Sequence, residues 1–510
     1  MKRVKLFFMN ALLLAAGTVL MHFIGVAFQV YLVSKIGSAG IGLYQLMMSV
    51  YFLAVTLAVS GIKFAVTRLV ALELAVDNRA GVKKAMRCCI LYALIFGTGA
   101  AFLLYNSAEF ISYRWLSADA LPSLRLLAIG LPTVSLSCVI SGYFIAVRGI
   151  VKNVLIQIFE QMSKIAFIVA IFTLLMPEGL KYACLAMVAG SVAAEAISCG
   201  VSCLLYLLDR RKYRTGKAPP AGMPRKMLGI ALPIAFSAYV RAALSMAESL
   251  LTPYGLKKSG ISTESALSAY GIIRGMVMPI LLFPASFLHA ASDLLIPELS
   301  EFYAQGKRRS IHYTVSRALQ ITALFAIGMS GLLYSFAEEF SLLIYRSSET
   351  AECIRLLAPL VPFIYIDETV DGMLKGLGEQ VSSMRYNIID SFVGVVMIWF
   401  LLPKYAIKGY IITIFVTELL NFALSAGRLV AVTQLRVDLM KLLVKPVFGI
   451  VGAVCASRVL FRLLEFPSRL NFFSLSAQIV LTLVIYGLFL MLSACITRED
   501  FRWFRNIFKS

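Results

Sequence analysis

The chain has 510 residues, of which 60% are hydrophobic and 15% are charged, and its mean hydropathy is +0.85. This is more apolar surface than a soluble core can bury, so the composition excludes a soluble globular protein. The net charge of +21 does not indicate a nucleic-acid partner, because the cations fall in short segments between apolar runs. The nine cysteines lack zinc-site spacing, and we interpret them as reduced packing residues and expect no transition-metal site.

The apolar runs predict an all-α integral membrane protein, because about 20 apolar residues are enough for a helix to cross a bilayer. The first run follows "MKRVK", but it is too long for a signal peptide and lacks a small-residue cleavage site. We predict about fourteen transmembrane helices, at residues 6–33, 41–67, 85–105, 123–147, 154–176, 183–208, 227–252, 268–292, 315–337, 354–377, 386–402, 407–430, 440–464 and 474–496.

The connecting segments predict the orientation in the membrane. Lys and Arg number roughly 31 on the side of the amino terminus and about 13 on the other side, and such an excess is typical of the cytoplasmic side. We therefore expect a multi-pass protein of the cell membrane with both termini in the cytoplasm.

The longest basic link, "LDRRKYRTGKAPPAGMPRKM" at 208–227, divides the predicted helices into two sets of six. We predict an N-terminal six-helix lobe at 1–208, a cytoplasmic basic linker at 209–226 and a C-terminal six-helix lobe at 227–432. Residues 433–510 would then form two additional transmembrane helices and a basic C-terminal tail.

The two predicted lobes repeat each other in sequence. "LRLLAIGLPTVSLSCVISGYF" at 124–144 matches "IRLLAPLVPFIYIDETVDGML" at 354–374 with an offset of 230, which pairs Gly142 with Gly372 and, further on, Glu160 with Asp390. The second and eighth helices match at an offset of 226. Matched elements six helices apart cross the membrane in the same direction, so we predict a parallel repeat with a site between the halves near the midplane.

Charged residues inside predicted spans are candidate site residues, because a charge in the bilayer normally faces water or a counter-ion. Arg241 lies near mid-span of the seventh helix, with Glu248 two turns further along the same face. Arg274 lies in the eighth helix, followed by Pro279 and Pro284, each of which removes a backbone donor and bends a helix. The simpler alternatives are a structural ion pair for Arg241 and Glu248, and an interfacial anchor for Arg274.

The second half also carries polar residues inside its spans. Their oxygen atoms suit a sodium ion or a proton relay, although packing is the simpler alternative. The candidate ion-coupling residues are Asp367, Asn387, Asp390, Thr413, Thr417 and Glu418.

Three segments resemble a known family: "KIGSAGIGLYQLMMSVYFLAVTLAVSG" at 35–61, "TRLVALE" at 67–73 and "YGIIRGMVMPILLFPASFLHAASDLLIPELSE" at 270–301. They look like the polysaccharide and lipid-linked saccharide flippases of the stage V sporulation protein B family, whose superfamily also holds lipid II flippases and MATE exporters. The sequence departs from the family pattern at Lys63 and Phe64, where a small or proline-containing pair is expected.

The resemblance implies two lobes around a cationic cavity that opens alternately to each side of the membrane. In related lipid II flippases an arginine five residues before a proline faces this cavity, and Arg274 and Pro279 keep that spacing. Arg241 and Arg274 would bind a pyrophosphate, which guanidinium groups contact at two points, and Glu248 would hold one of them when no substrate is present. Pro279 and Pro284 would act in gating.

The function predicted from these observations is flipping of a polyprenyl-pyrophosphate-linked saccharide, a cell-wall or spore-cortex precursor, from the cytoplasmic to the outer leaflet. The alternative is a MATE-type cation-coupled multidrug exporter. An enzyme is not expected, because the links are short and carry no HExxH, GxSxG or nucleotide-binding motif. We expect no cofactor beyond sodium or proton coupling, a monomer, and a cell-wall polymerase or glycosyltransferase as partner.

Overall fold

The computed structural model describes residues 2–76, 78–175, 179–210, 222–435, 438, 440–463 and 472–495. Most of the predicted basic linker (211–221) and the predicted basic tail (496–510) lie outside this part of the chain. Within these ranges all the regular structure is helical and no strand occurs. The all-α prediction is therefore confirmed, as expected for a chain whose backbone polar groups must be satisfied inside a bilayer.

Within the described residues, each predicted span falls mainly on helix, although the span 41–67 is interrupted by a turn at Ser60 and Gly61. In the described part of the chain, eleven helical stretches are long and apolar enough to cross a membrane. One of these, Gln380–Thr433, contains the two predicted spans 386–402 and 407–430. Another, Val19–Ala75, contains the predicted span 41–67 and the second part of the span 6–33. The predicted span 354–377 coincides with three successive short elements, α13 (Ser348–Leu357), η4 (Ala358–Leu360) and α14 (Val361–Gly376). The chain is a multi-pass membrane protein.

Two helices continue through a sharp change of direction. α1 (Lys2–Val59) contains Gly37 at φ 69° and α15 (Gln380–Thr433) contains Ala406 at φ 49°. Glycine adopts this left-handed conformation without a steric penalty, whereas alanine pays one. Each of these helices therefore has two arms.

The contacts divide the chain into two compact units, which we call unit 1 (Met1–Ser38 and Ala269–Ser510) and unit 2 (Ala39–Ser268). The first arm of α1 thus groups with the second half of the chain. Conversely, α7 (Met223–Lys258) packs on α2 (Ile62–Ala75) and α3 (Arg79–Trp115) of unit 2. The predicted lobes 1–208 and 227–432 lie on either side of the basic link, and that division stays a prediction.

Unit 2 is built around α4 (Leu121–Ala146), which packs against α3, α2 and α6 (Leu180–Arg210). α5 (Ile150–Leu175) lies against α6, and α4 follows the short helix η1 (Ala118–Ala120). The core of this unit includes the fully buried Tyr143 and Phe144.

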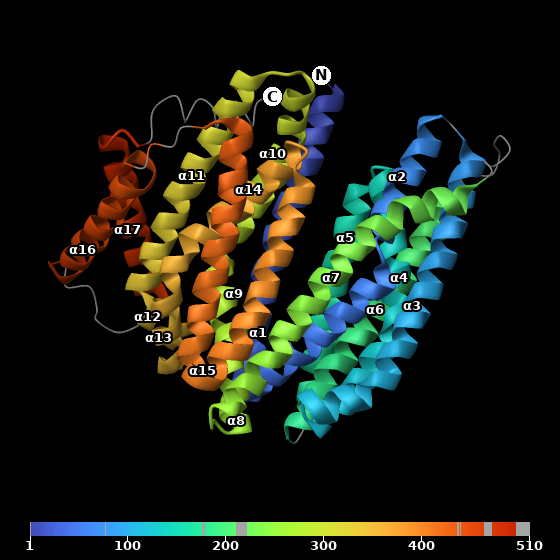
Figure 1. Cartoon of the computed structure of the whole chain (residues 1–510), viewed down its shortest axis with the longest axis horizontal. Helices are drawn as coiled ribbons and strands as arrows, with labels where there is room; N and C mark the ends of the chain where they lie inside the picture. Colours follow the sequence, from blue (N-terminus) through green and yellow to red (C-terminus); the bar gives the residue numbers. More distant parts are fainter. Residues whose placement is uncertain are drawn as a thin grey trace. The chain divides into compact units, whose positions relative to one another are not determined.

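Unit 1 is built around α14, which packs against α10 (Ala285–Ala304), α11 (Arg308–Ser335) and α15. α16 (Lys445–Leu463) and α17 (Phe472–Leu492), the two helices beyond the repeat, pack side by side (Figure 1). Unit 1 also contains η3 (Gly271–Val277), α9 (Met278–Leu282), α12 (Ala337–Ile344) and η5 (Met440–Val444). The short helix α8 (Thr263–Tyr270) lies at the boundary, with all but its last two residues in unit 2.

One close helix contact of unit 2 recurs in unit 1. A Cβ atom on Gly142 of α4 would lie 3.2 Å from Cβ of Val66, and one on Gly372 of α14 would lie 2.9 Å from Cβ of Ser292. Gly142 and Gly372 are matched at the offset of 230, and Val66 and Ser292 at the offset of 226. The predicted repeat is therefore present as an equivalent close helix contact in both units.

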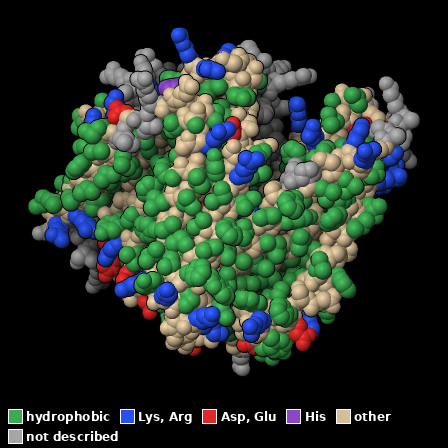
Figure 2. All heavy atoms as spheres, in the orientation of Figure 1, with side chains coloured by type: hydrophobic (Ala, Val, Ile, Leu, Met, Phe, Trp, Pro, Cys, Tyr) green, Lys and Arg blue, Asp and Glu red, His purple; other side chains and the backbone are tan. Residues whose placement is uncertain are grey.

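The surface agrees with a lipid environment. Hydrophobic side chains cover much of the face shown in Figure 2, and Lys and Arg lie mainly toward the ends of the helices. Large apolar side chains such as Phe102 and Phe448 are each 70% exposed. This exposure would be unfavourable in water, but in a bilayer these side chains contact lipid acyl chains.

Candidate functional site

The eighth predicted span is a broken helix made of α8, η3, α9 and α10. η3 is a π-helix in which the N–H of Met278 donates to the carbonyl of Ile273, five residues earlier. Arg274 lies in this segment, and π-helical turns are frequent at functional sites. Unit 1 therefore presents the predicted arginine on an irregular backbone.

Pro279 explains part of this irregularity. A proline has no N–H, so the carbonyl of Gly275, four residues earlier, loses its usual α-helical donor. The side-chain amide of Gln29, on the first arm of α1, donates to this carbonyl with Nε2 at 3.1 Å. The carbonyl that loses its α-helical donor to Pro279 is thus paired by a side chain from another helix of the same unit.

The second break lies at Pro284, between the end of α9 at Leu282 and the start of α10 at Ala285. The hydroxyl of the fully buried Tyr365 donates to the carbonyl of Leu281 at 2.6 Å. Ser286 Oγ donates to the carbonyl of Phe283 at 2.7 Å. The helix therefore breaks where the prolines predicted a bend, and their predicted gating role stays a prediction.

Arg274 is held by the second arm of α15. Its Nε donates to the hydroxyl of Tyr410 at 2.9 Å, and Tyr410 is 1% exposed. Arg274 itself is half-buried. The contact fixes one edge of the guanidinium against a rigid aromatic side chain, and such pre-organisation favours anion binding.

Arg241 and Glu248 lie on α7 of unit 2, where Arg241 is exposed and Glu248 is half-buried. The carbonyl of Glu248 accepts a hydrogen bond from Thr252 Oγ1 at 2.8 Å. Because Arg274 belongs to unit 1, the idea that these three residues act on one substrate path stays a prediction.

Polar side chains of α14 and α15 form an acidic cluster, which we define as Asp367, Asp371, Ser383, Asn387, Asp390, Asn421 and Ser425. Asn421 Nδ2 donates to Asp367 Oδ2 at 2.8 Å. Asp371 accepts from Ser383 Oγ at 2.6 Å and from Asn387 Nδ2 at 3.5 Å. Asp390 lies close enough to Asp367 for their charges to interact. The cluster thus joins α14 to both arms of α15.

Buried oxygen atoms of this cluster that make no hydrogen bond with the described residues include Asp367 Oδ1, Asn421 Oδ1 and Ser425 Oγ. The Ser425 side chain lies beside the Asp367 carboxylate. A buried acceptor without a partner costs about 1–3 kcal/mol. Such oxygens are suited to a bound cation, a proton or water.

The predicted ion-coupling residues are only partly brought together. Asp367, Asn387 and Asp390 belong to the acidic cluster. Thr413 and Thr417 donate their hydroxyls to backbone carbonyls one turn earlier, those of Gly409 and Thr413, both at 2.9 Å. Their protons are therefore used within α15.

Asn421 and Ser425 were not among the site residues predicted from the sequence. A signal was present, because Thr413, Thr417, Asn421 and Ser425 are spaced four residues apart and so lie on one helix face. Among the described residues, no group of three or more His, Cys, Asp or Glu side chains is arranged to hold a metal ion.

An ion pair near the cluster joins Arg428, near the end of α15, to Glu379, which lies just outside the membrane-crossing stretch. Arg428 contacts Glu379 through two hydrogen bonds, Nη2 to Oε1 at 2.8 Å and Nε to Oε2 at 3.1 Å. Ser382 Oγ also donates to Glu379 at 2.7 Å. The bonds from Arg428 and Ser382 lower the pKa of Glu379 below its usual value. Glu379 immediately precedes the first arm of α15, and Arg428 lies near the end of the second arm. The ion pair therefore joins the two arms of α15.

Comparisons with known proteins agree with this fold. The chain is 24% identical to stage V sporulation protein B of Bacillus subtilis (strain 168) over 505 residues, 94% of this chain and 95% of the relative. It is 21% identical to sporulation protein YkvU of the same organism over 378 residues, 72% of this chain and 82% of the relative.

Two solved structures have the same fold. The lipid II flippase MurJ in an inward closed conformation matches with a TM-score of 0.69 at 14% identity, covering 94% of this chain and 98% of MurJ. An inward-facing multidrug resistance MATE family transporter matches with a TM-score of 0.62 at 14% identity, covering 81% of this chain and 96% of the transporter.

Family models locate the resemblance along the chain. A model described as MatE matches residues 259–400, which include the broken helix and Asp367. A model described as polysaccharide biosynthesis protein matches residues 7–303, more than half of the chain. The chain therefore belongs to the polysaccharide biosynthesis protein family.

Proposed function

We propose that the protein flips a polyprenyl-pyrophosphate-linked saccharide from the cytoplasmic to the outer leaflet of the cell membrane, as a transporter rather than an enzyme. Its relatives in polysaccharide biosynthesis and its likeness to a lipid II flippase support this class. The observation that carries the proposal is Arg274, a half-buried arginine inside a broken membrane helix, held through its Nε by Tyr410.

Arg274 matches the chemistry of a pyrophosphate. A multiply charged anion that leaves water needs cationic donors that replace its hydration, because an unpaired charge in a low dielectric is very costly. The planar guanidinium presents two donors to one phosphate at once. Arg241, which is exposed on α7, would make a second contact on the same path.

The acidic cluster would couple this movement to a cation. Asp367 Oδ1, Asn421 Oδ1 and Ser425 Oγ are buried acceptors that make no hydrogen bond with the described residues, and both sodium ions and protons bind such oxygens. Positive charge in the connecting segments supports a cytoplasmic location of both termini.

A binding experiment separates the proposed function from its alternative. Purified protein would be titrated with undecaprenyl pyrophosphate, lipid II and a cationic drug, with Arg355→Ala as a control that removes an arginine outside the site. The proposal requires binding of the pyrophosphate lipids and its loss in Arg274→Ala only. Drug binding without lipid binding would instead favour the MATE-type exporter, which the MatE match supports.

A further inference from the structure

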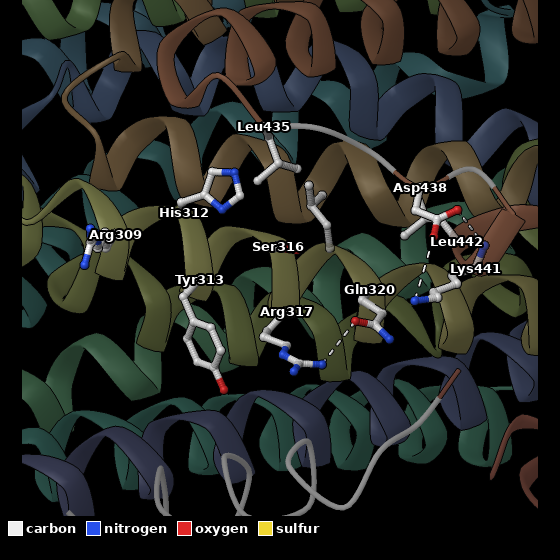
Figure 3. A pocket seen from close by; sticks show the side chains of 11 residues that line it. Arg309, His312, Tyr313, Ser316, Arg317, Gln320, Leu435, Asp438, Lys441 and Leu442 are labelled. Atoms are coloured by element: carbon white, nitrogen blue, oxygen red, sulfur yellow. Dashed lines mark hydrogen bonds and ion pairs between the residues drawn. The ribbon is translucent and has the colours of Figure 1, made fainter. Parts of the chain in front are cut away.

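A pocket in unit 1 lies on residues that belong to neither the broken helix nor the acidic cluster. Its described lining comes from the first turns of α11, from Leu435 and Asp438 after α15, and from η5, and its volume is about 620 Å³. Figure 3 shows Arg317 and Gln320 on α11, with Asp438 and Lys441 at one end. We call this site the basic pocket.

Positive charge dominates the described lining of the basic pocket. Arg309, Arg317 and Lys441 line it, against the carboxylate of Asp438. The Oδ1 of Asp438 accepts hydrogen bonds from the backbone N–H groups of Met440 at 3.1 Å and Lys441 at 3.4 Å. Its contact with Lys441 Nζ is 3.9 Å between exposed side chains, which is a weak ion pair. The basic pocket is therefore suited to further acidic groups.

The end of α17 lies beside this pocket. α17 is followed by a tight turn in which Ala494 has a left-handed φ of 55° and the N–H of Cys495 donates to the carbonyl of Leu490 at 3.0 Å, as in a Schellman motif. Cys495 is fully buried. Its carbonyl accepts a hydrogen bond at 2.5 Å from Nε2 of Gln320, which lines the pocket. The chain therefore leaves α17 at the edge of the basic pocket.

Gln320 connects this chain end to a pocket cation. While its Nε2 donates to the Cys495 carbonyl, its Oε1 accepts from Nη1 of Arg317 at 3.5 Å. The Arg317 guanidinium also lies 5.5 Å from the centroid of the Tyr313 ring. Four extended residues span at most roughly 13–14 Å. The first few residues after Cys495 are thus long enough to reach the guanidinium.

The segment that follows carries the matching charge. Residues 496–510, "ITREDFRWFRNIFKS", lie outside the described residues, and we call them the tail. Its two carboxylates are adjacent, at Glu499 and Asp500, soon after Cys495. A carboxylate is a two-point acceptor that matches a guanidinium. The covalent link favours this ligand over a diffusible anion, because a short tether gives an effective concentration of roughly millimolar.

We propose that Glu499 and Asp500 bind in the basic pocket of their own chain, where they pair with Arg317 and Lys441. This contact fastens the chain after α17 to the start of α11 and to η5. The two helices beyond the repeat are then tied to α11 by charge as well as by the packing of α16 and α17 on α11. The proposal does not depend on the transported substrate.

Zero-length cross-linking of the full-length protein in phosphatidylcholine nanodiscs tests this contact. A carbodiimide joins a carboxylate to a lysine amine only where the two groups touch, and peptide mass spectrometry identifies the pair. We expect an amide between Lys441 and Glu499 or Asp500, formed within one chain in a mixture of unlabelled and heavy-nitrogen-labelled protein. An amide between Asp438 and Lys441, whose charged groups lie 3.9 Å apart, would show that the reagent reaches the pocket.

Trypsin cleavage after Arg498 measures how often the tail is unbound. Arg317→Gln/Lys441→Gln leaves the tail sequence unchanged and should be cleaved there roughly tenfold faster than the wild type, because the protease cuts the unbound form. Arg355→Gln removes an arginine outside the pocket, 4.0 Å from Glu338, and should be cleaved at the wild-type rate. Thermal unfolding verifies that the variants are folded, and the cross-link is measured on the wild type alone.

Three results would overturn the proposal. One is the amide between Asp438 and Lys441 without any amide to Glu499 or Asp500. Another is a cross-link found only between differently labelled chains, which would assign the pocket to the tail of a second copy. The last is equal cleavage of the wild type and the pocket variant in phosphatidylcholine, with protection only after phosphatidylglycerol is added, which would assign the tail to an anionic lipid surface.

Discussion

The helix predicted at 41–67 in the first copy of the repeat corresponds to the broken helix in the second copy. The two differ at the positions of the candidate arginine and the two prolines. At the offset of 226, Arg274 corresponds to Met48, Pro279 to Leu53 and Pro284 to Ala58. The first copy is continuous helix up to Val59, whereas the second is π-helical at Gly271–Val277 and breaks after Leu282.

The two copies nevertheless keep one bond at the end of this stretch. Ser60 Oγ donates to the carbonyl of Leu57, and Ser286 Oγ donates to the carbonyl of Phe283. Ser286 lies 226 residues after Ser60, and Phe283 lies 226 residues after Leu57. The arginine and the prolines are therefore additions to a shared scaffold, and the comparison locates the specialised chemistry in the second copy.

The acidic cluster shows the same difference. In unit 2, Ser141 Oγ donates to Asn153 Oδ1 at 2.8 Å; in unit 1, Ser383 Oγ donates to Asp371 Oδ1 at 2.6 Å. Asp371 follows Ser141 by 230, and Ser383 follows Asn153 by 230. One contact between neighbouring helices thus occurs twice, but only the second copy makes it with a carboxylate.

The largest expected effect comes from removing the arginine of the second copy. Arg274→Ala should reduce flipping by about two orders of magnitude or more, because no guanidinium replaces the water of the pyrophosphate. Arg274→Lys should lose most of the activity, since an ammonium cannot make the planar two-point contact. Met48→Ala, at the matched position of the first copy, should stay within about twofold of the wild type in the same vesicle assay. Equal losses in both copies would contradict the assignment.

The carboxylates of the second copy should control ion dependence. Asp367→Asn and Asp390→Asn should each remove the sodium or proton dependence of transport and lower the rate by roughly tenfold, while the protein stays folded. Ser137→Ala, matched to Asp367 at the offset of 230, should preserve the dependence. Transport measured with and without each gradient would decide this, and unchanged ion dependence in Asp367→Asn would exclude its role.

A smaller loss is expected when the partner of Arg274 is changed. Tyr410→Phe removes the hydroxyl that accepts from Arg274 Nε, and a hydrogen bond to a charged group contributes about 1.5–3 kcal/mol. We expect weaker binding of the pyrophosphate lipid by roughly tenfold, with little change in thermal stability. Substrate titration of the folded variant checks this, and an unchanged affinity would show that Tyr410 does not position the arginine.

The broken helix itself can be tested by a double-mutant cycle. Gln29→Ala leaves the Gly275 carbonyl without its side-chain donor and should destabilise the protein by about 1 kcal/mol or more. Pro279→Ala supplies a backbone N–H that can take over this role, so Gln29→Ala should cost less in that background. Additive changes in the free energy of unfolding would mean that Gln29 does not compensate for the proline.

The smallest expected effect is on pH dependence. The pKa of Glu379 is lowered by Arg428 and Ser382, so the pair contributes stability above the usual glutamate pKa and loses it as the pH falls through the lowered value. Arg428→Gln should flatten this part of the stability profile in thermal unfolding at acidic pH. An identical pH profile in the variant would show that the pair contributes nothing measurable.

The helices and their breaks could be predicted from sequence because length, hydropathy and proline act locally. The predicted ranges fell on helices, and the bend expected at Pro284 is present. The role of Gln29 could not be predicted, because it depends on a contact 246 residues away along the chain.

The central claim is that the second copy of the repeat carries a pyrophosphate-recognising arginine for lipid-linked saccharide flipping. The most direct test is a flipping assay in proteoliposomes with a fluorescent polyprenyl-pyrophosphate saccharide, comparing wild type, Arg274→Ala and Met48→Ala. We predict that wild type and Met48→Ala move the lipid at similar rates and that Arg274→Ala does not exceed protein-free vesicles. Flipping by Arg274→Ala at the wild-type rate would contradict the account.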